Sequence, residues 1–317
     1  VRHMSRCPLI LVLGVTASGK GALAFELART LGGVIVSIDS MKVYRRMDIG
    51  TAKPAAEKRR QIPYHLIDVV EPSESFSVDR FLDLANETID AILARGKAVV
   101  AVGGTALYIK TLLFGLFDGP GEDPQIRRRL GDRFGAEGGA VLHEQLRSID
   151  PEAAARIHPN DQRRIVRALE VYELTGRPIS SFQQQFTSDR MLRDWTILGL
   201  RRDKTVESRR IKLRVMRMID QGLAQEVRSL LAEDKPLSQQ ARAAIGYAEM
   251  IEHLEGRMTL DDAVEKITVN TRKLAKAQRT WFKTFRQVRW LDVGDEESVE
   301  SVLSRALPLI SGDQSNP

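Results

Sequence analysis

The fold is decided by residues 9–21, which read LILVLGVTASGKG. The apolar run 9–13 is typical of a buried parallel strand, and a helical pattern of apolar residues begins at Ala22. Strand, glycine-bounded loop, lysine and helix in this order form the context that a phosphate-binding loop requires. We call residues 14–21 the glycine loop, and we predict that its backbone N–H groups and Lys20 bind a phosphate or diphosphate.

The position after the lysine departs from the pattern of nucleotide-hydrolysing loops. Those loops carry Ser or Thr there, because the hydroxyl holds Mg²⁺, whereas this chain has Gly21. The ligands of a metal are therefore uncertain, with Thr16, Ser18 and Asp39 as the nearby candidates. A chance match on a turn rich in small residues is the competing interpretation, and the flanking strand and helix disfavour it.

The composition indicates a globular protein. The 317 residues are 43% hydrophobic and 28% charged, which are ordinary values. No apolar run approaches the roughly 18 residues that span a bilayer, and we expect neither a membrane segment nor a signal peptide. Cys7 is the only cysteine, which excludes an intramolecular disulfide and a cysteine-based zinc finger. A cytoplasmic location fits, and no obligate protein partner is implied.

Strands and helices alternate after the glycine loop. Strands are predicted at 34–38, 63–68 and 97–102, with a helix over 77–95 between the last two. The alternation stops at a Pro/Gly/acidic stretch, 118–124, that is typical of a domain boundary. This order predicts the α/β class, with a P-loop-type parallel sheet flanked by helices.

The middle of the chain predicts an inserted all-helical domain. Helical patterns without an alternating strand follow at 126–134, 139–148, 151–157 and 161–175. The return to the sheet and the elements after it are predicted as a strand at 195–200, helices at 204–221, 223–233, 244–255 and 260–285, and a strand at 288–291. The domain prediction is a first part of the core at 5–120, the insert at 121–192, the return strand and C-terminal helices at 193–311, and a disordered tail at 312–317.

Polar residues follow two of the predicted strands. Asp39 and Ser40 come directly after the strand at 34–38, and Thr105 opens a helix just after the strand at 97–102. Ligands bind at the carboxyl ends of parallel strands in open α/β sheets. Asp39 could instead cap a helix, but its place beside the glycine loop favours a functional role.

Basic residues are concentrated in two segments. Lys and Arg exceed Asp and Glu by 48 − 42 = 6, with eight basic against two acidic residues in 201–217 and seven against none in 268–290. Arg272, Lys276 and Arg279 are spaced by four and three, which places them on one face of a helix. Solvated helix faces are the alternative, but two such segments favour a polyanionic partner.

The motifs taken together resemble the tRNA dimethylallyltransferases over about residues 9–290. The resemblance is carried by GVTASGK at 14–20, DS at 39–40, MDIGTAKP at 47–54, VGGTALY at 102–108, RIHPND at 156–161, Arg164, RALEV at 167–171 and IGY at 245–247. It implies transfer of a dimethylallyl group from dimethylallyl diphosphate to N6 of the adenine 3′ of the anticodon, in the tRNA anticodon loop. It also implies Mg²⁺ as cofactor and no hydrolysis of ATP.

The resemblance assigns roles to residues of this chain. Asp39 is implied as general base or N6-orienting acceptor, and Thr105, Arg127 and Arg214 as catalytic residues that stabilise the diphosphate. The implied diphosphate- or nucleotide-binding residues are Gly14, Val15, Thr16, Ala17, Ser18, Gly19, Lys20 and Gly21. The tRNA-binding residues predicted from the resemblance and the basic segments are Asp39, Ser40, Met41, Lys42, Gln162, Arg163, Arg164, Ile165, Val166, Arg167, Gly246, Tyr247, Arg272, Lys276 and Arg279.

Two departures from the family pattern leave alternatives open. The family has Pro at the position of Val15 and Thr or Ser at that of Gly21, and the second change removes a hydroxyl expected near the diphosphate. A catalytically weak tRNA-binding protein is therefore one alternative. An adenylate isopentenyltransferase acting on a free nucleotide is another, which the helical insert and the basic segments disfavour. A small-molecule kinase would need the hydroxyl that Gly21 lacks.

Overall fold

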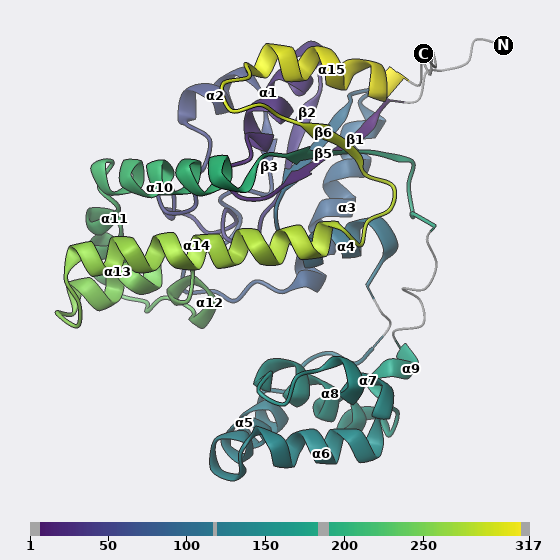
Figure 1. Cartoon of the computed structure of the whole chain (residues 1–317). Helices are drawn as coiled ribbons and strands as arrows, with labels where there is room; N and C mark the ends of the chain where they lie inside the picture. The colour runs from purple at the N-terminus through teal and green to yellow at the C-terminus, as the bar shows by residue number, and fades with distance from the viewer. Residues whose placement is uncertain (1–6, 117–118, 183–189, 312–317) are drawn as a thin grey trace. The chain divides into compact units, whose positions relative to one another are not determined.

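The computed structural model describes residues 7–116, 119–182 and 190–311, and it divides the chain into two units (Figure 1). The core unit consists of residues 1–113 and 192–317, and the insert unit consists of residues 114–191. The sequence indicated an insert at 121–192. The predicted disordered tail, 312–317, lies outside the described residues.

The core unit is built on a parallel six-stranded sheet in the order β3-β2-β4-β1-β5-β6. The strands are β1 (Leu9–Gly14), β2 (Val34–Ile38), β3 (Tyr64–His65), β4 (Val99–Gly103), β5 (Trp195–Arg201) and β6 (Arg289–Asp292). β1 lies between β4 and β5, and its apolar run from Ile10 to Leu13 is fully buried. Strands covered on both faces read as continuous apolar runs, and the predicted fold class is confirmed.

Helices cover both faces of this sheet. The helices of the core unit are α1 (Lys20–Thr30), α2 (Ala56–Gln61), α3 (Val78–Ala94), α4 (Ala106–Phe114), α10 (Lys204–Asp220), α11 (Leu223–Leu231), α12 (Gln239–Arg242), α13 (Tyr247–Leu254), α14 (Leu260–Phe282) and α15 (Val299–Ser311). Leu23 of α1 and Val302 of α15 belong to one apolar cluster with Ile10 and Leu198 of the sheet. α3 packs against β2 and β4, on the face away from α1 and α15 (Figure 1).

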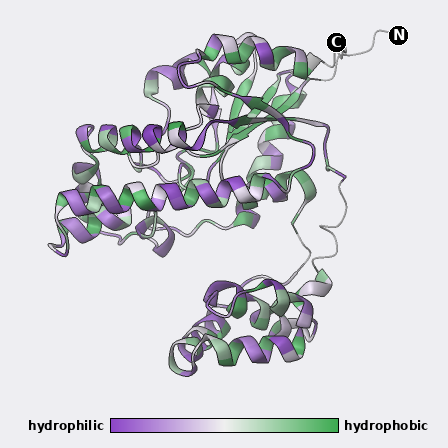
Figure 2. Ribbon diagram, viewed as in Figure 1, coloured by the Kyte–Doolittle hydropathy of each residue, from purple (hydrophilic) through white to green (hydrophobic). Residues whose placement is uncertain are grey.

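Two long helices, α10 and α14, pack together beside the sheet, with α11 and α13 next to them. In Figure 2 the central strands are mostly hydrophobic, whereas α10 and α14 alternate between hydrophilic and hydrophobic residues. α14 begins with a capping box, because the Thr259 hydroxyl accepts from the Asp262 N–H and the Asp262 carboxylate accepts from the Thr259 N–H. The helix runs for 23 residues from there and contacts β1.

The described part of the insert unit is helical. Its helices are α5 (Pro124–Glu137), α6 (Gly139–Ile149), α7 (Pro151–Arg156), α8 (Gln162–Thr175) and α9 (Ile179–Phe182). Asp123 caps α5 through its side chain, and Gly176 ends α8 at φ +67°, a conformation that glycine adopts without strain. Leu130, Leu142 and Leu169 belong to a separate apolar core, as expected of a unit with its own fold.

The two ends of the insert leave the core unit at paired positions. The N–H of Leu192 donates to the carbonyl of Leu113 at 2.8 Å. The sequence predicted no helix for α2, α12 or α15, and the helix predicted at 244–255 corresponds to α13. Within the described ranges, no helix combines the length and the apolar composition that crossing a membrane requires.

Candidate active site

The glycine loop joins the central strand β1 to the N-terminus of α1. Gly19 caps α1 at φ +98°, and Ala17 has φ +62°, a left-handed conformation that is strained for a residue with a side chain. The N–H of Ser18 donates to the carbonyl of Val15 at 3.2 Å and closes the turn. A Cβ on Gly14 would lie 2.7 Å from Ser18 Oγ, so this position needs glycine.

Gln278 of α14 fixes the loop from a distant part of the chain. Its Oε1 accepts from the N–H of Thr16 at 2.8 Å, and its Nε2 donates to the carbonyl of Gly104 at 2.8 Å. Both hydrogen bonds are buried, so water does not compete for them. Gln278 therefore locks the glycine loop to the connection between β4 and α4. Sequence reasoning did not find it.

Asp39 lies at the end of β2, beside the end of β4. Ile38 and Gly103 are register partners, and the N–H of Ser40 donates to Oγ1 of Thr105 at 3.0 Å. Asp39 Oδ1 accepts from the N–H groups of Met41 and Lys42 at 2.9 and 3.2 Å. Its Oδ2 accepts no hydrogen bond from the residues that the structure describes, which leaves that oxygen available to a ligand.

Lys20, Lys42 and Arg214 interact electrostatically with this carboxylate. Burial, and then the charges of Arg214 and Lys42, lower the pKa of Lys20 to about 7, while Asp39 acts in the opposite direction. Burial also lowers the pKa of Lys42, against the effect of Asp39, and burial lowers the pKa of Arg214. Three bases around one acid leave an excess of positive charge. The arrangement suits an anion with more than one negative charge.

Part of the segment after Asp39 is held in place by ion pairs. Lys53 Nζ lies 2.7 Å from Asp48 Oδ1 and 2.6 Å from Asp68 Oδ1, and it donates to the carbonyl of Tyr44 at 2.5 Å. The Lys53 side chain is 1% exposed, whereas those of Asp48 and Asp68 are 51% and 33% exposed. The resemblance includes Lys53, and the structure gives it a positioning role.

The carboxylate of Glu226 on α11 holds the same segment. It accepts from the N–H groups of Asp48, Ile49 and Gly50 at 2.8 to 3.2 Å, and from the Tyr247 hydroxyl at 2.6 Å. Tyr247 is fully buried. Burial and the charge of Glu226 raise the pKa of Tyr247, so the hydroxyl stays a donor. The Tyr247 side chain packs inside the core unit, and the predicted part of Tyr247 in tRNA binding stays a prediction. The contact predicted for Gly246, the N-cap of α13, stays a prediction.

Several of the predicted site residues lie in the insert unit. Arg127 Nε lies 3.0 Å from Glu170 Oε1, and Arg167 Nη1 lies 2.6 Å from Glu170 Oε2. Ile165 and Val166 belong to the core of this unit, so their side chains are buried, and their predicted part in tRNA binding stays a prediction. Of the predicted residues on α8, Gln162, Arg163 and Arg164 are exposed. The catalytic role predicted for Arg127 stays a prediction.

Only part of the predicted basic face of α14 is exposed and available to bind tRNA. Arg272 and Lys276 are exposed. Arg279 is paired with Glu207, a buried carboxylate on α10. An arginine that neutralises a buried carboxylate is held in the protein, so its availability to tRNA is reduced. The other two residues keep the predicted role.

No metal site with several protein ligands is formed by the described residues, because no group of three or more His, Cys, Asp or Glu side chains could hold an ion. Ser18 Oγ is a buried hydroxyl that has no hydrogen-bond partner within the described part of the chain. Among the predicted metal candidates, Ser18 therefore has a hydroxyl without a hydrogen-bond partner, and Asp39 keeps Oδ2 available.

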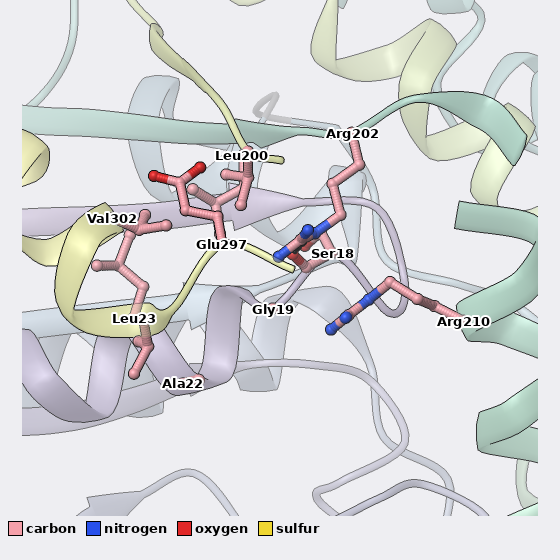
Figure 3. Close-up of a pocket in the computed structure, with 11 residues that line it drawn as sticks. Ser18, Gly19, Ala22, Leu23, Leu200, Arg202, Arg210, Glu297 and Val302 are labelled. Carbon is pink, nitrogen blue, oxygen red and sulfur yellow. Dashed lines mark hydrogen bonds between the residues drawn. The ribbon is translucent and has the colours of Figure 1, made fainter. Parts of the chain in front are cut away.

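A cavity of about 190 Å³ borders the glycine loop (Figure 3). Ser18, Gly19 and Leu23 line it from the loop and α1, and Arg202 and Arg210 line it from the segment after β5. These two arginines were not predicted, because nothing in their spacing distinguishes them from other basic residues in 201–217.

The fold and the loop define an α/β protein with a glycine-bounded loop, a cationic cluster and one accessible carboxylate at the carboxyl edge of a parallel sheet. Residues 42–285 match the family described as IPP transferase, and the chain belongs to this family.

Individual relatives agree along nearly the whole chain. It is 48% identical over 311 residues to a tRNA dimethylallyltransferase of Geobacter metallireducens, covering 97% of this chain and 99% of the relative. The crystal structure of a tRNA isopentenylpyrophosphate transferase from Bacillus halodurans is 37% identical, with a TM-score of 0.69 over 96% of this chain and 97% of that one. A eukaryotic dimethylallyltransferase acting on tRNA is 29% identical, with a TM-score of 0.79, over 97% of this chain and 79% of that one.

Proposed function

We propose that this enzyme transfers the dimethylallyl group of dimethylallyl diphosphate to N6 of the adenine 3′ of the anticodon in tRNA, and releases diphosphate. The observation that carries the proposal is the cluster of Lys20, Lys42 and Arg214 around Asp39, beside the glycine loop. Such a cluster binds a multiply charged anion and places a base next to it. Family membership supports tRNA as the acceptor, and we expect the enzyme to act in the cytoplasm.

The proposed transfer reaction follows from the charged groups of this site. The adenine N6 attacks C1 of the dimethylallyl group, the C1–O bond breaks, and its electron pair leaves with the diphosphate. N6 loses a proton to Asp39 Oδ2, the oxygen that the protein leaves free. An exocyclic amine is a weak nucleophile, and a positioned general base contributes about 10²- to 10⁴-fold. Lys20, Arg214 and the loop N–H groups stabilise the charge that develops on the leaving group.

The residues present fit a magnesium ion. Mg²⁺ binds through one or two protein oxygens together with substrate phosphates and water, so it needs no cluster of carboxylates. The unpartnered hydroxyl of Ser18 would hold it together with the diphosphate and water, while Asp39 Oδ2 stays available as the base. Bound there, the ion would neutralise part of the leaving-group charge. Thr105, which accepts the N–H of Ser40, would keep Asp39 oriented toward the same place.

The tRNA surface is proposed from exposed basic residues. Arg272 and Lys276 on α14 and Arg163 and Arg164 on α8 are exposed and would bind phosphates of the anticodon loop. An adenine stacked in that loop must leave the stack to reach Asp39, which costs a few kcal/mol. Contacts with the neighbouring nucleotides would offset this cost.

The test is transfer of labelled dimethylallyl diphosphate to unmodified tRNA and, in parallel, to AMP. Asp39→Asn keeps the oxygen that accepts from Met41 and Lys42 but removes the base, so we expect turnover to fall by about 10²-fold or more with tRNA affinity unchanged. Label on AMP alone would show that the enzyme acts on a free nucleotide, as an adenylate isopentenyltransferase does. If the unmodified protein binds tRNA tightly but transfers no label, it is a tRNA-binding protein without transferase activity.

A further inference from the structure

Arg202 connects the glycine loop to the C-terminal part of the core unit. Its Nε donates to the carbonyl of Ser18 at 2.9 Å. Its Nη1 donates to the carbonyl of Gly294 and, at 3.4 Å, to that of Asp295. Gly294 and Asp295 lie in the connection between β6 and α15. One guanidinium therefore joins two segments that are far apart in the sequence (Figure 3).

The bond to Ser18 has a direct consequence for the anion site. The peptide group between Ser18 and Gly19 is planar and trans, so its C=O and its N–H point in opposite directions. Arg202 holds the carbonyl on its own side, and the N–H of Gly19 must then point the other way. Gly19 lies directly before Lys20, where the N–H groups at the start of α1 face an anion.

Arg210 holds the preceding peptide group in the same way. Its Nε donates to the carbonyl of Ala17 at 2.9 Å, which fixes the N–H of Ser18 toward its acceptor, the carbonyl of Val15. Ala17 is strained at φ +62°, and a strained residue keeps its conformation only where its surroundings hold it. Figure 3 shows both guanidinium groups extending toward the loop from the segment after β5.

The surroundings of Arg202 are consistent with a role in setting the shape of the glycine loop. Burial, and then the charge of Arg210, lower the pKa of Arg202, while Asp295 and Glu297 act in the opposite direction. The side chain of Asp295 pairs instead with Arg209. The polar contacts made by Arg202 are with backbone carbonyls, as expected of a group that sets the shape of a loop.

We propose that Arg202 is a positioning residue for diphosphate binding, which orients the N–H of Gly19 through the Ser18 carbonyl, and that Arg210 supports it at Ala17. The inference rests on the proposed function, because the anion is the diphosphate of that reaction. It also gives residues 293–295, outside the range that matches the family, a share in the shape of the active site.

The chain offers a matched control next to Arg202. Arg201 is exposed and forms a two-point ion pair with Asp292, with both N–O distances 2.8 Å. Arg201→Met removes the same charge one residue away without touching the loop. Comparison of Arg201→Met with Arg202→Met separates loop positioning from a general loss of positive charge.

The experiment is calorimetric titration with inorganic pyrophosphate at one fixed Mg²⁺ concentration. We expect Arg202→Met to weaken binding about tenfold, since a hydrogen bond from a charged donor carries at least that factor. Arg202→Lys, with a single donor group in place of the fork, is expected to restore part of the loss. The KM for dimethylallyl diphosphate should rise in parallel, with unchanged affinity for tRNA.

The outcomes are distinguishable. If the unmodified protein binds pyrophosphate and Arg202→Met binds it as tightly as Arg201→Met does, the positioning role is refuted and the proposed function stands. If Arg202→Met is unfolded, Arg202→Lys decides by the same titration. If the unmodified protein does not bind pyrophosphate, the proposed function fails and this inference fails with it.

Discussion

Diphosphate binding should weaken as the pH rises through neutrality, because Lys20 loses its charge there. Burial, Arg214 and Lys42 together lower the pKa of Lys20 to about 7, against the opposing effect of Asp39. A free lysine has a pKa of 10.5, so the ordinary expectation is no change below pH 9. A bound diphosphate favours the charged form and raises the pKa of Lys20 again.

The size of the effect follows from the charged fraction of the free protein. With a pKa of about 7, about nine-tenths of Lys20 is charged at pH 6 and about one-tenth at pH 8. The apparent dissociation constant is the intrinsic one divided by the competent fraction. It should therefore rise about tenfold between these two pH values, provided that the charged form alone binds the anion.

Calorimetry with pyrophosphate measures both the affinity and the protons exchanged. Titrations in two buffers of different ionisation enthalpy should show proton uptake near pH 8. Lys20→Met is the control, because pyrophosphate loses its own protons equally with both proteins. The difference in proton uptake between the two proteins therefore reports on the cationic cluster. Equal pH dependence of both would refute the charge loss at Lys20.

The same shift predicts a stability effect with a definite sign. Between pH 7 and 10.5 the unfolded chain keeps a proton on Lys20 that the folded chain has lost. The free energy of unfolding should therefore rise with pH across this window and be flat below it. Urea denaturation at pH 7 and pH 9 measures the rise. Lys20→Met should remove it.

Three further predictions concern positions with clear surroundings. Gly21→Ser adds a side chain where a Cβ meets nothing within 4 Å, and we expect turnover to rise and the Mg²⁺ requirement to fall in the transfer assay; unchanged kinetics would show that the missing hydroxyl has no role. Gly103→Ala places a Cβ 1.9 Å from the carbonyl oxygen of Ile38, and urea denaturation should show a loss of about 3 kcal/mol or more, whereas Gly21→Ala should cost nothing. Joint replacement of Arg272 and Lys276 by Ala should weaken tRNA binding and reduce its salt slope by about one to two; an unchanged slope would exclude this face of α14.

The parts of the fold that follow from local pattern could be predicted from the sequence. The apolar run at 9–13 has no polar residue to face water, so it had to be covered on both sides. Asp39 and Thr105 were found because parallel strands end at the same edge. The helix α15 was missed, and its sequence contains Pro308, an atypical residue inside a helix.

The parts that depend on long-range contacts could not be predicted. Gln278 contacts Thr16 across 262 positions of sequence, and no local pattern marks a glutamine that caps a distant loop. Arg202 and Arg210 bind carbonyls, which carry no side-chain signature. Ile165 and Val166 are a different case: an apolar pair on a helix is more often core than surface, and that rule would have predicted their burial in the core of the insert unit.

The hydrogen bond between Leu113 and Leu192 makes the insert unit a removable part of the chain. An insertion whose two ends lie close together leaves its host with a small gap to close. A short flexible linker between these two residues should let the sheet form without the insert, and the excised helices retain a core of their own. New loops or whole domains could be grafted at the same junction, with the diphosphate site left intact and the choice of acceptor open to change.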